Sequence, residues 1–145
     1  MKKTNSKVQF HFIGQKHFFF PNRRKLKSFI ELLFKKERKK LLHVSYVFCS
    51  DEFLLKINQE YLNHDYYTDI VTFDLSETYQ IVGEIYISID RVKDNAKTFN
   101  SSFFEELHRV IFHGALHLSG YADKTINEKA RMTKKENFYL QKFFA

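Results

Sequence analysis

Two histidines and an aspartate near the carboxyl end of the chain have the types and spacing of a metal site. They belong to the segment 113–123, which reads His-Gly-Ala-Leu-His-Leu-Ser-Gly-Tyr-Ala-Asp. If this segment is helical, His113 and His117 project from one face, so both imidazoles can reach one metal at about 2.0–2.1 Å. Gly120 is expected to end the helix, which lets Asp123 return as a third ligand. Three protein ligands leave a position for water, whose proton a metal makes easier to remove.

The histidine pair alone is weak support for a metal, because such pairs also occur on helix surfaces and as hydrogen-bonded core residues. The helix terminator and the carboxylate that follow the pair favour the metal interpretation. His108 lies about 140° around the helix from His113, which favours a structural role. The sequence assigns no role to the four remaining histidines, which are scattered: His11, His17, His43 and His64.

The spacing of the pair also resembles the zinc helix of zincins and metzincins. In that pattern a glutamate follows the first histidine and acts as general base, whereas this chain has Gly114 there. Peptide hydrolysis by that mechanism lacks its base, so we do not expect a protease. The glycine is instead expected to let a substrate approach the helix backbone closely.

Hydrophobic periodicity predicts the elements that must position this segment. Alternation of apolar and polar residues, or runs of β-branched and aromatic residues, predict strands at 8–12, 42–48, 70–73 and 83–88. A stripe with helical period predicts a first helix through Leu26, Phe29, Ile30, Leu33 and Phe34. Further helices are expected at 53–61 after Ser50-Asp51, at 89–99 after Ser88, from Ser102 to near Gly120, and from Thr125 to about 143.

The order of these elements predicts the fold class. Strands and helices interleave in the first part of the chain, and only helices follow. This order is typical of an α+β fold, a small mixed sheet of about four strands packed with helices, with the metal-site helix near the C-terminus. Since neither a repeat nor a linker interrupts the pattern, we expect a single domain over residues 1–145.

Composition excludes several classes of protein. A hydrophobic share of 43% with 17 Phe and 8 Tyr rules out a disordered chain, and the scarcity of Gly (4) and Pro (1) rules out fibrous classes. No run approaches the roughly 18 apolar residues of a membrane span, and polar residues interrupt the N-terminal segment too often for a signal peptide. Cys49 is the single cysteine. We therefore expect a soluble, cytoplasmic protein with no membrane segment and no disulfide partner.

Positive charge is concentrated in the first quarter of the chain. Residues 1–40 carry 13 Lys/Arg and 2 Glu, a local net charge of +11, whereas residues 41–145 carry −4. Such a patch attracts a polyanion such as RNA, although a solvated helix face that only keeps a protein soluble has the same composition. The candidate RNA contacts are Arg23, Arg24, Lys35 and Lys36.

Four motifs together are similar to those of a known family. The pattern His113-Gly114-x-Leu116-His117-Leu118-x-Gly120-Tyr121-x-Asp123 resembles the signature of the YbeY family of rRNA maturation factors or endoribonucleases. The other motifs agree in order and spacing: Asn58-x-x-Tyr61 followed by Asp65, Thr68-Asp69-Ile70-Val71-Thr72-Phe73, and Gly83-Glu84-Ile85-x-Ile87-Ser88. The resemblance runs from about residue 45 to about residue 140.

The resemblance implies a metal-dependent endoribonuclease specific for single-stranded RNA. It implies a role in maturing the 3′ end of small-subunit rRNA and in ribosome quality control, with the small subunit as partner. It also implies one divalent metal, zinc in this family, held by three histidines, of which His113 and His117 match the first two. Asp123 stands at the third position, and a set of two histidines and a carboxylate also suits Fe²⁺ or Mn²⁺. Leu62 stands where the family usually carries an arginine, and leucine cannot bind phosphate.

Several points stay open at the level of sequence. Tyr61, Tyr66 or Tyr67 could stack on unpaired bases or simply pack in the fold. No general acid is assigned. The alternatives to a ribonuclease are a non-catalytic ribosome assembly factor that binds rRNA or a ribosomal protein, a metal hydrolase for a small molecule, and an oxygenase with two histidines and a carboxylate.

Overall fold

The computed structural model describes residues 6–14 and 21–145, and within them nine elements follow one another along the chain. They are β1 (Val8–Phe12), α1 (Arg23–Lys36), β2 (Lys40–Cys49), α2 (Asp51–Leu62), β3 (Ile70–Asp74), β4 (Gln80–Ser88), α3 (Ile89–Thr98), α4 (Phe103–Leu118) and α5 (Ile126–Phe144). The four predicted strands and five predicted helices are thus confirmed, with ends that differ by a few residues. His17 lies outside the described residues.

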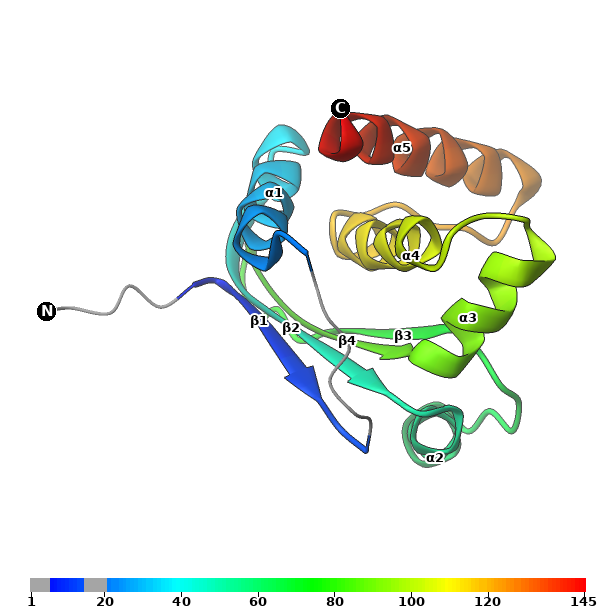
Figure 1. Ribbon diagram of the computed structural model, residues 1–145. Helices are drawn as coiled ribbons and strands as arrows, with labels where there is room; N and C mark the ends of the chain where they lie inside the picture. Colours follow the sequence, from blue (N-terminus) through cyan, green and yellow to red (C-terminus); the bar gives the residue numbers. More distant parts are fainter. Residues whose placement is uncertain (1–5, 15–20) are drawn as a thin grey trace, which may run out of the picture.

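The four strands form one mixed sheet in the order β1-β2-β4-β3 (Figure 1). β1 runs parallel to β2, and β2 runs parallel to β4, with Val44 paired to both Val8 and Gly83. β3 and β4 form an antiparallel hairpin in which Val71 pairs with Tyr86. The predicted α+β class is therefore confirmed, and β3 is an edge strand of the sheet.

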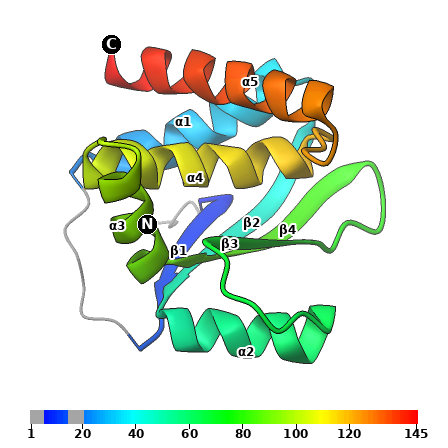
Figure 2. The same ribbon diagram turned by 90° about the vertical axis from the view of Figure 1, so that its right-hand side faces the viewer.

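Helices cover the two faces of the sheet unequally. α1, α4 and α5 lie on one face, while α2 lies alone on the other (Figures 1 and 2). Because neighbouring side chains on a strand point to opposite faces, the sheet contributes to two hydrophobic clusters, one on each face. Tyr46, Phe48 and Ile85 belong to the larger cluster, whereas Cys49 and Val71 join the smaller cluster with residues of α2.

Hydroxyl side chains begin the helices as the sequence predicts. Ser50, Ser88 and Ser102 each accept a hydrogen bond from the backbone N–H three residues later, at 3.0–3.2 Å. Thr125 and Glu128 form a complete capping box at the start of α5. Gly120, just beyond α4, has φ 106°, a value that a residue without Cβ adopts without strain.

α4 lies close against the sheet at two glycines. A Cβ on Gly114 would lie 2.9 Å from Cδ1 and 3.0 Å from Cγ2 of Ile85, and a Cβ on Gly83 would lie 2.5 Å from Cδ1 of Leu118. The expectation that Gly114 admits a substrate to the helix backbone is therefore wrong. The glycine faces the sheet, and its missing side chain makes room for Ile85 of β4.

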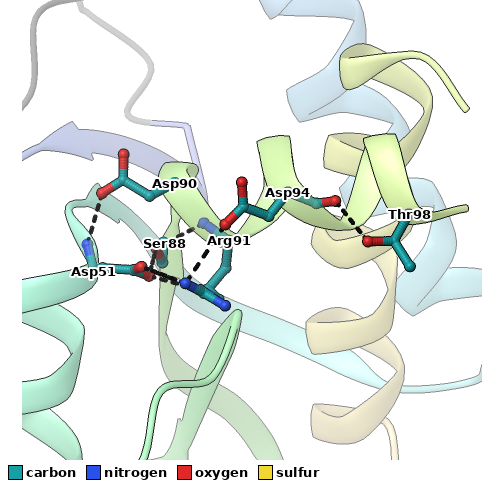
Figure 3. A network of polar contacts seen from close by, with 6 residues as sticks. All are labelled: Asp51, Ser88, Asp90, Arg91, Asp94 and Thr98. Atoms are coloured by element: carbon teal, nitrogen blue, oxygen red, sulfur yellow. Dashed lines mark hydrogen bonds and ion pairs between the residues drawn. The ribbon is translucent and has the colours of Figure 1, made fainter. Parts of the chain in front are cut away.

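A polar network joins the start of α2 to the start of α3 (Figure 3). The Arg91 guanidinium donates to both carboxylate oxygens of Asp51 at 3.0–3.2 Å, and the Ser88 hydroxyl donates to Asp51 at 2.6 Å. The backbone N–H of Asp51 donates to Asp90 at 2.9 Å. The same guanidinium lies 5.5 Å from the ring centre of Tyr67, so the network also contacts the segment that leads from α2 to β3.

Within residues 6–14 and 21–145, we find no helix with both the length and the apolar character needed to cross a membrane.

Candidate metal centre

The structure brings His113, His117 and Asp123 together at the end of α4. The two histidines are one turn apart, and their rings lie 4.5 Å apart at 81°. Oδ2 of Asp123 lies 3.2 Å from Nε2 of His113 and 3.3 Å from Nε2 of His117. The three residues each offer one ligand atom, and all three atoms lie within 4.8 Å of one another.

These separations fit a single small divalent ion. Two ligand atoms at 2.0–2.1 Å from a tetrahedral metal are about 3.3 Å apart. The two measured nitrogen–oxygen distances match that edge, so the group could hold a metal ion with the side chains where they are.

Glu136 of α5 fixes the orientation of one ligand ring. Its Oε2 lies 2.5 Å from Nδ1 of His113, and its Oε1 accepts a hydrogen bond from Arg109 at 3.0 Å. Arg109 also donates to Asn137 at 2.7 Å. A carboxylate can only accept here, so the N–H of Nδ1 donates to Glu136. In the neutral imidazole the lone pair is then on Nε2, the atom that faces His117 and Asp123.

The surroundings of His113 favour its charged form in the absence of a metal. Burial lowers the pKa of the imidazole, but the hydrogen bond and negative charge of Glu136, with the charges of Asp123 and Asp69, outweigh burial and raise it. A divalent cation and a proton therefore compete for this concentration of negative charge.

A second carboxylate holds the loop that carries Asp123. Glu37, just after α1, accepts hydrogen bonds from Tyr121 at 2.6 Å, from Lys135 at 3.2 Å and from the hydroxyl of Tyr139. Burial alone would raise the pKa of Glu37, but these three donors lower it. Tyr121 is two residues from Asp123, so the ligand loop is tied to α1 and α5.

The three candidate ligands line a cavity of about 610 Å³. Its lining comes from the end of α2, the segment that follows it, β3, α4, α5 and the Asp123 loop: Asn58, Leu62, His64, Tyr66, Thr68, Asp69, Ile70, Val71, Thr72, Glu106, Arg109, Val110, His113, His117, Asp123 and Glu136. The cavity therefore lies beside the edge strand β3 and combines the ligand group with aromatic and charged side chains.

Two acids shape the charge of this cavity: Glu106, which is buried, and Asp69, which is half-buried. Burial raises the pKa of Asp69, although His113, Asn95 and a backbone N–H favour its charged form. Burial, followed by the charge of Asp69, raises the pKa of Glu106 to about 7, with Arg109 acting in the opposite direction. Glu106 is therefore only partly ionised near neutral pH, which limits the negative charge in the cavity.

Sequence reasoning missed four residues of this site, which are Asp69 (quoted only as part of a motif), Glu106, Arg109 and Glu136. One signal was available for the two glutamates, because each interrupts an otherwise apolar helix face. Glu136 shares the buried face of α5 with Met132 and Tyr139, and Glu106 adjoins the buried residues of α4. His64, to which the sequence gave no role, also lines the cavity.

The remaining candidates lie elsewhere. None of the four predicted RNA contacts on α1 lines this cavity. Arg23 and Arg24 border one surface hollow and Lys35 borders another, over the β1 and β2 side of the sheet. His108 is buried, donates from Nδ1 to the carbonyl of Phe104 at 2.6 Å and packs on Phe143, which agrees with a structural role.

Comparison with known proteins gives one consistent family. The model of the family described as Endoribonuclease YbeY matches residues 14–144. A relative named Endoribonuclease YbeY from Cytophaga hutchinsonii is 52% identical over 119 residues, which is 81% of this chain and 83% of that protein. Another of that name from Amoebophilus asiaticus is 43% identical over 132 residues, 90% of each. The solution structure of a Thermotoga maritima protein is also similar, with a TM-score of 0.66 and 30% sequence identity. The match covers 94% of this chain and 89% of that one.

Proposed function

Since this chain belongs to the Endoribonuclease YbeY family, we propose that it is a metal-dependent endoribonuclease that cleaves single-stranded RNA. We further propose that it acts as one domain over residues 1–145 in the cytoplasm. Its substrate is ribosomal RNA, with the small subunit as its partner in 3′-end maturation and ribosome quality control.

One observation carries the proposal. Two imidazole nitrogens and a carboxylate oxygen meet at distances of 3.2 and 3.3 Å, in the wall of a cavity large enough for a nucleotide. Three protein ligands beside such a space are typical of a catalytic metal site and not of a closed structural one. Zinc is the metal we propose, and Fe²⁺ or Mn²⁺ suits the same set.

Each residue of the site then has a defined task. His113, His117 and Asp123 would hold the ion, and a bound ion would supply Lewis-acid chemistry at a phosphate oxygen and lower the pKa of water. Glu136 orients the His113 ring so that Nε2 faces the other ligands, and the raised pKa of Glu106 lowers the average negative charge that an entering phosphate meets. The basic residues of α1 attract the RNA chain from outside the cavity.

The test is cleavage of a labelled single-stranded RNA by protein that has been stripped of metal and then supplied with Zn²⁺, Mn²⁺ or Fe²⁺. We expect activity to return with at least one ion, and His113→Ala to abolish it. The matched control is His11→Ala, which alters an exposed histidine of β1. Equal cleavage by the His113→Ala variant would mean that the site is not the nuclease centre.

A non-catalytic ribosome assembly factor is a second candidate, favoured by one observation. Leu62 lies in the cavity wall and contributes no charge for a phosphate. RNA binding without cleavage under any of the three ions would support this candidate.

A further inference from the structure

The structure separates the three tyrosines that the sequence left equivalent. The ring of Tyr61 packs edge-on against Phe73, with centres 6.0 Å apart at 78°. The ring of Tyr67 lies under the guanidinium of Arg91. Of the three, Tyr66 alone lines the cavity with the metal-ligand group, and 56% of its surface is exposed.

Tyr66 forms a pair with His64 in the cavity wall. The two rings are nearly parallel, with centres 5.0 Å apart at 21°, and the tyrosine hydroxyl lies 3.0 Å from Nδ1 of the imidazole. More than half of the surface of Tyr66 stays exposed, so the residue is accessible to a further group.

The segment that carries this pair is held in place by the end of α2. Asn58, only 1% exposed, donates from Nδ2 to the carbonyl of Tyr66 at 3.1 Å. The backbone carbonyl of Asn58 accepts a hydrogen bond from the backbone N–H of His64 at 3.0 Å. Asn63 turns the chain there with a φ of 55°, a left-handed conformation that asparagine tolerates. The pair is therefore positioned before any ligand arrives.

We propose that the His64–Tyr66 pair is the stacking site for one unpaired nucleobase of the RNA whose backbone lies at the metal-ligand group. Aromatic rings bind every base through its π face, so the site recognises a base without reading its identity. A base within a duplex is already covered on both faces and cannot enter the cavity. The pair would thus select single strands. This inference rests on the proposed ribonuclease function.

The first test measures affinity without cleavage, by fluorescence anisotropy of a short labelled single-stranded RNA with metal-stripped protein. Loss of one base–aromatic stack, worth about 1–3 kcal/mol, predicts that Tyr66→Ala binds about 5- to 150-fold more weakly. Tyr66→Phe keeps the ring and is expected to bind within a factor of about 3 of the wild type. The matched control is Tyr79→Ala, which removes a tyrosine that is 74% exposed and outside the cavity.

The second test locates the base. A single abasic nucleotide is placed at each position of the oligonucleotide in turn. At one position it should weaken RNA binding by the wild type by the same factor by which Tyr66→Ala weakens binding of the intact RNA. At that position the abasic RNA should not weaken the Tyr66→Ala variant further, because both changes remove one contact. Equal losses in wild type and variant at every position would overturn the proposal.

A spectroscopic readout is available because the chain contains no tryptophan. Tyr66→Trp introduces a single indole, and we expect single-stranded RNA to change its emission while a duplex of the same sequence does not. Tyr79→Trp provides the control and should respond to neither. No change in the Tyr66→Trp emission with bound RNA would also overturn the proposal.

The two levels of the hypothesis fail differently. If the wild type neither binds nor cleaves single-stranded RNA, the ribonuclease function itself is wrong. If it does both and His64→Ala or Tyr66→Ala leaves affinity and KM unchanged, only the stacking site is wrong. A loss confined to kcat in His64→Ala would also contradict stacking and indicate a part for the imidazole in proton transfer.

Discussion

The carboxylate of Glu136 lies 2.5 Å from Nδ1 of His113, although 23 residues separate them in the chain. The contact joins α5 to α4 at the atom opposite the one that faces Asp123. A carboxylate in this position fixes the tautomer and the ring orientation of a metal-binding histidine and makes its other nitrogen more basic. Arg109 pairs with the second oxygen of Glu136 and so balances its charge.

Replacement of Glu136 by glutamine should therefore weaken the metal site without removing a ligand. We expect metal affinity to fall about 10- to 100-fold, as is common when the partner of a ligand histidine is lost. Competition with a chromophoric chelator measures this directly, without RNA. Asn137→Ala, which disturbs only the other contact of Arg109, serves as control. Wild-type affinity in Glu136→Gln would show that the hydrogen bond does not tune the site.

Glu37→Gln should destabilise the fold in a manner that depends on pH. The three donors around Glu37 lower its pKa, so its charge contributes stability above the ordinary carboxyl pKa, and that contribution disappears as pH falls through the native value. We expect Glu37→Gln to lower the free energy of unfolding by about 1–3 kcal/mol at pH 7, and the difference from the wild type to shrink below about pH 4. Urea unfolding across this range measures it, with Glu31→Gln on α1 as control. If the free energy of unfolding falls by the same amount at every pH, hydrogen-bond geometry and not charge holds the loop.

Glu106→Gln should show the opposite dependence. Since burial and Asp69 raise the pKa of Glu106 to about 7, the native state holds a proton that the unfolded chain releases at lower pH. The associated stability is complete below the ordinary pKa of 4.5 and is lost as pH rises through about 7. The free energy of unfolding of the variant, measured relative to that of the wild type, should therefore rise by on the order of 2 kcal/mol between pH 5 and pH 8.

The measurement for Glu106 is thermal or urea unfolding of both proteins at several pH values. Glu105→Gln, at the neighbouring exposed position, is the control and should show no such trend. Parallel stability curves for wild type and Glu106→Gln would contradict the raised pKa.

Gly114→Ala should destabilise the protein even though alanine favours a helix by about 1 kcal/mol. The added Cβ would lie 2.9 and 3.0 Å from two carbons of Ile85 and 3.1 Å from Cδ1 of Ile70. Overpacking of this kind costs about 1–3 kcal/mol. Adding Ile85→Val, which removes the nearest carbon, should recover part of the loss. A Gly114→Ala variant as stable as the wild type would show that Ile85 and Ile70 can move to make room for the added Cβ.

The basic residues of α1 should govern the salt dependence of RNA binding and not the chemistry. Neutralising Arg23, Arg24, Lys35 and Lys36 to glutamine should lower the slope of log affinity against log salt by about 0.7 for each lost phosphate contact. The cleavage rate at saturating RNA should stay the same, because none of the four lines the cavity. Arg24→Gln can be compared with Lys56→Gln on α2, on the other face of the sheet. Equal slopes for all of these proteins would exclude α1 as the RNA contact.

The local features of this protein follow from its sequence. Helix starts at Ser88, Ser102 and Thr125 are set by side chains that bond the backbone three residues away, so short motifs predict them. The i, i+4 spacing of His113 and His117 likewise fixes their common face. Strand ends were less predictable, and β2 begins at Lys40, two residues before the predicted start, because its pairing with β4 extends there.

The rest of the site depends on contacts between segments far apart in the chain. The sheet order places β3 at the edge beside α4, which brings His64 and Tyr66 to the same cavity as the histidine pair. α5 folds back along α4 and supplies Glu136, and Glu37 reaches Tyr121 across 84 positions. A sequence specifies which side chains a helix presents, but only the packing of helices on the sheet determines what those side chains meet.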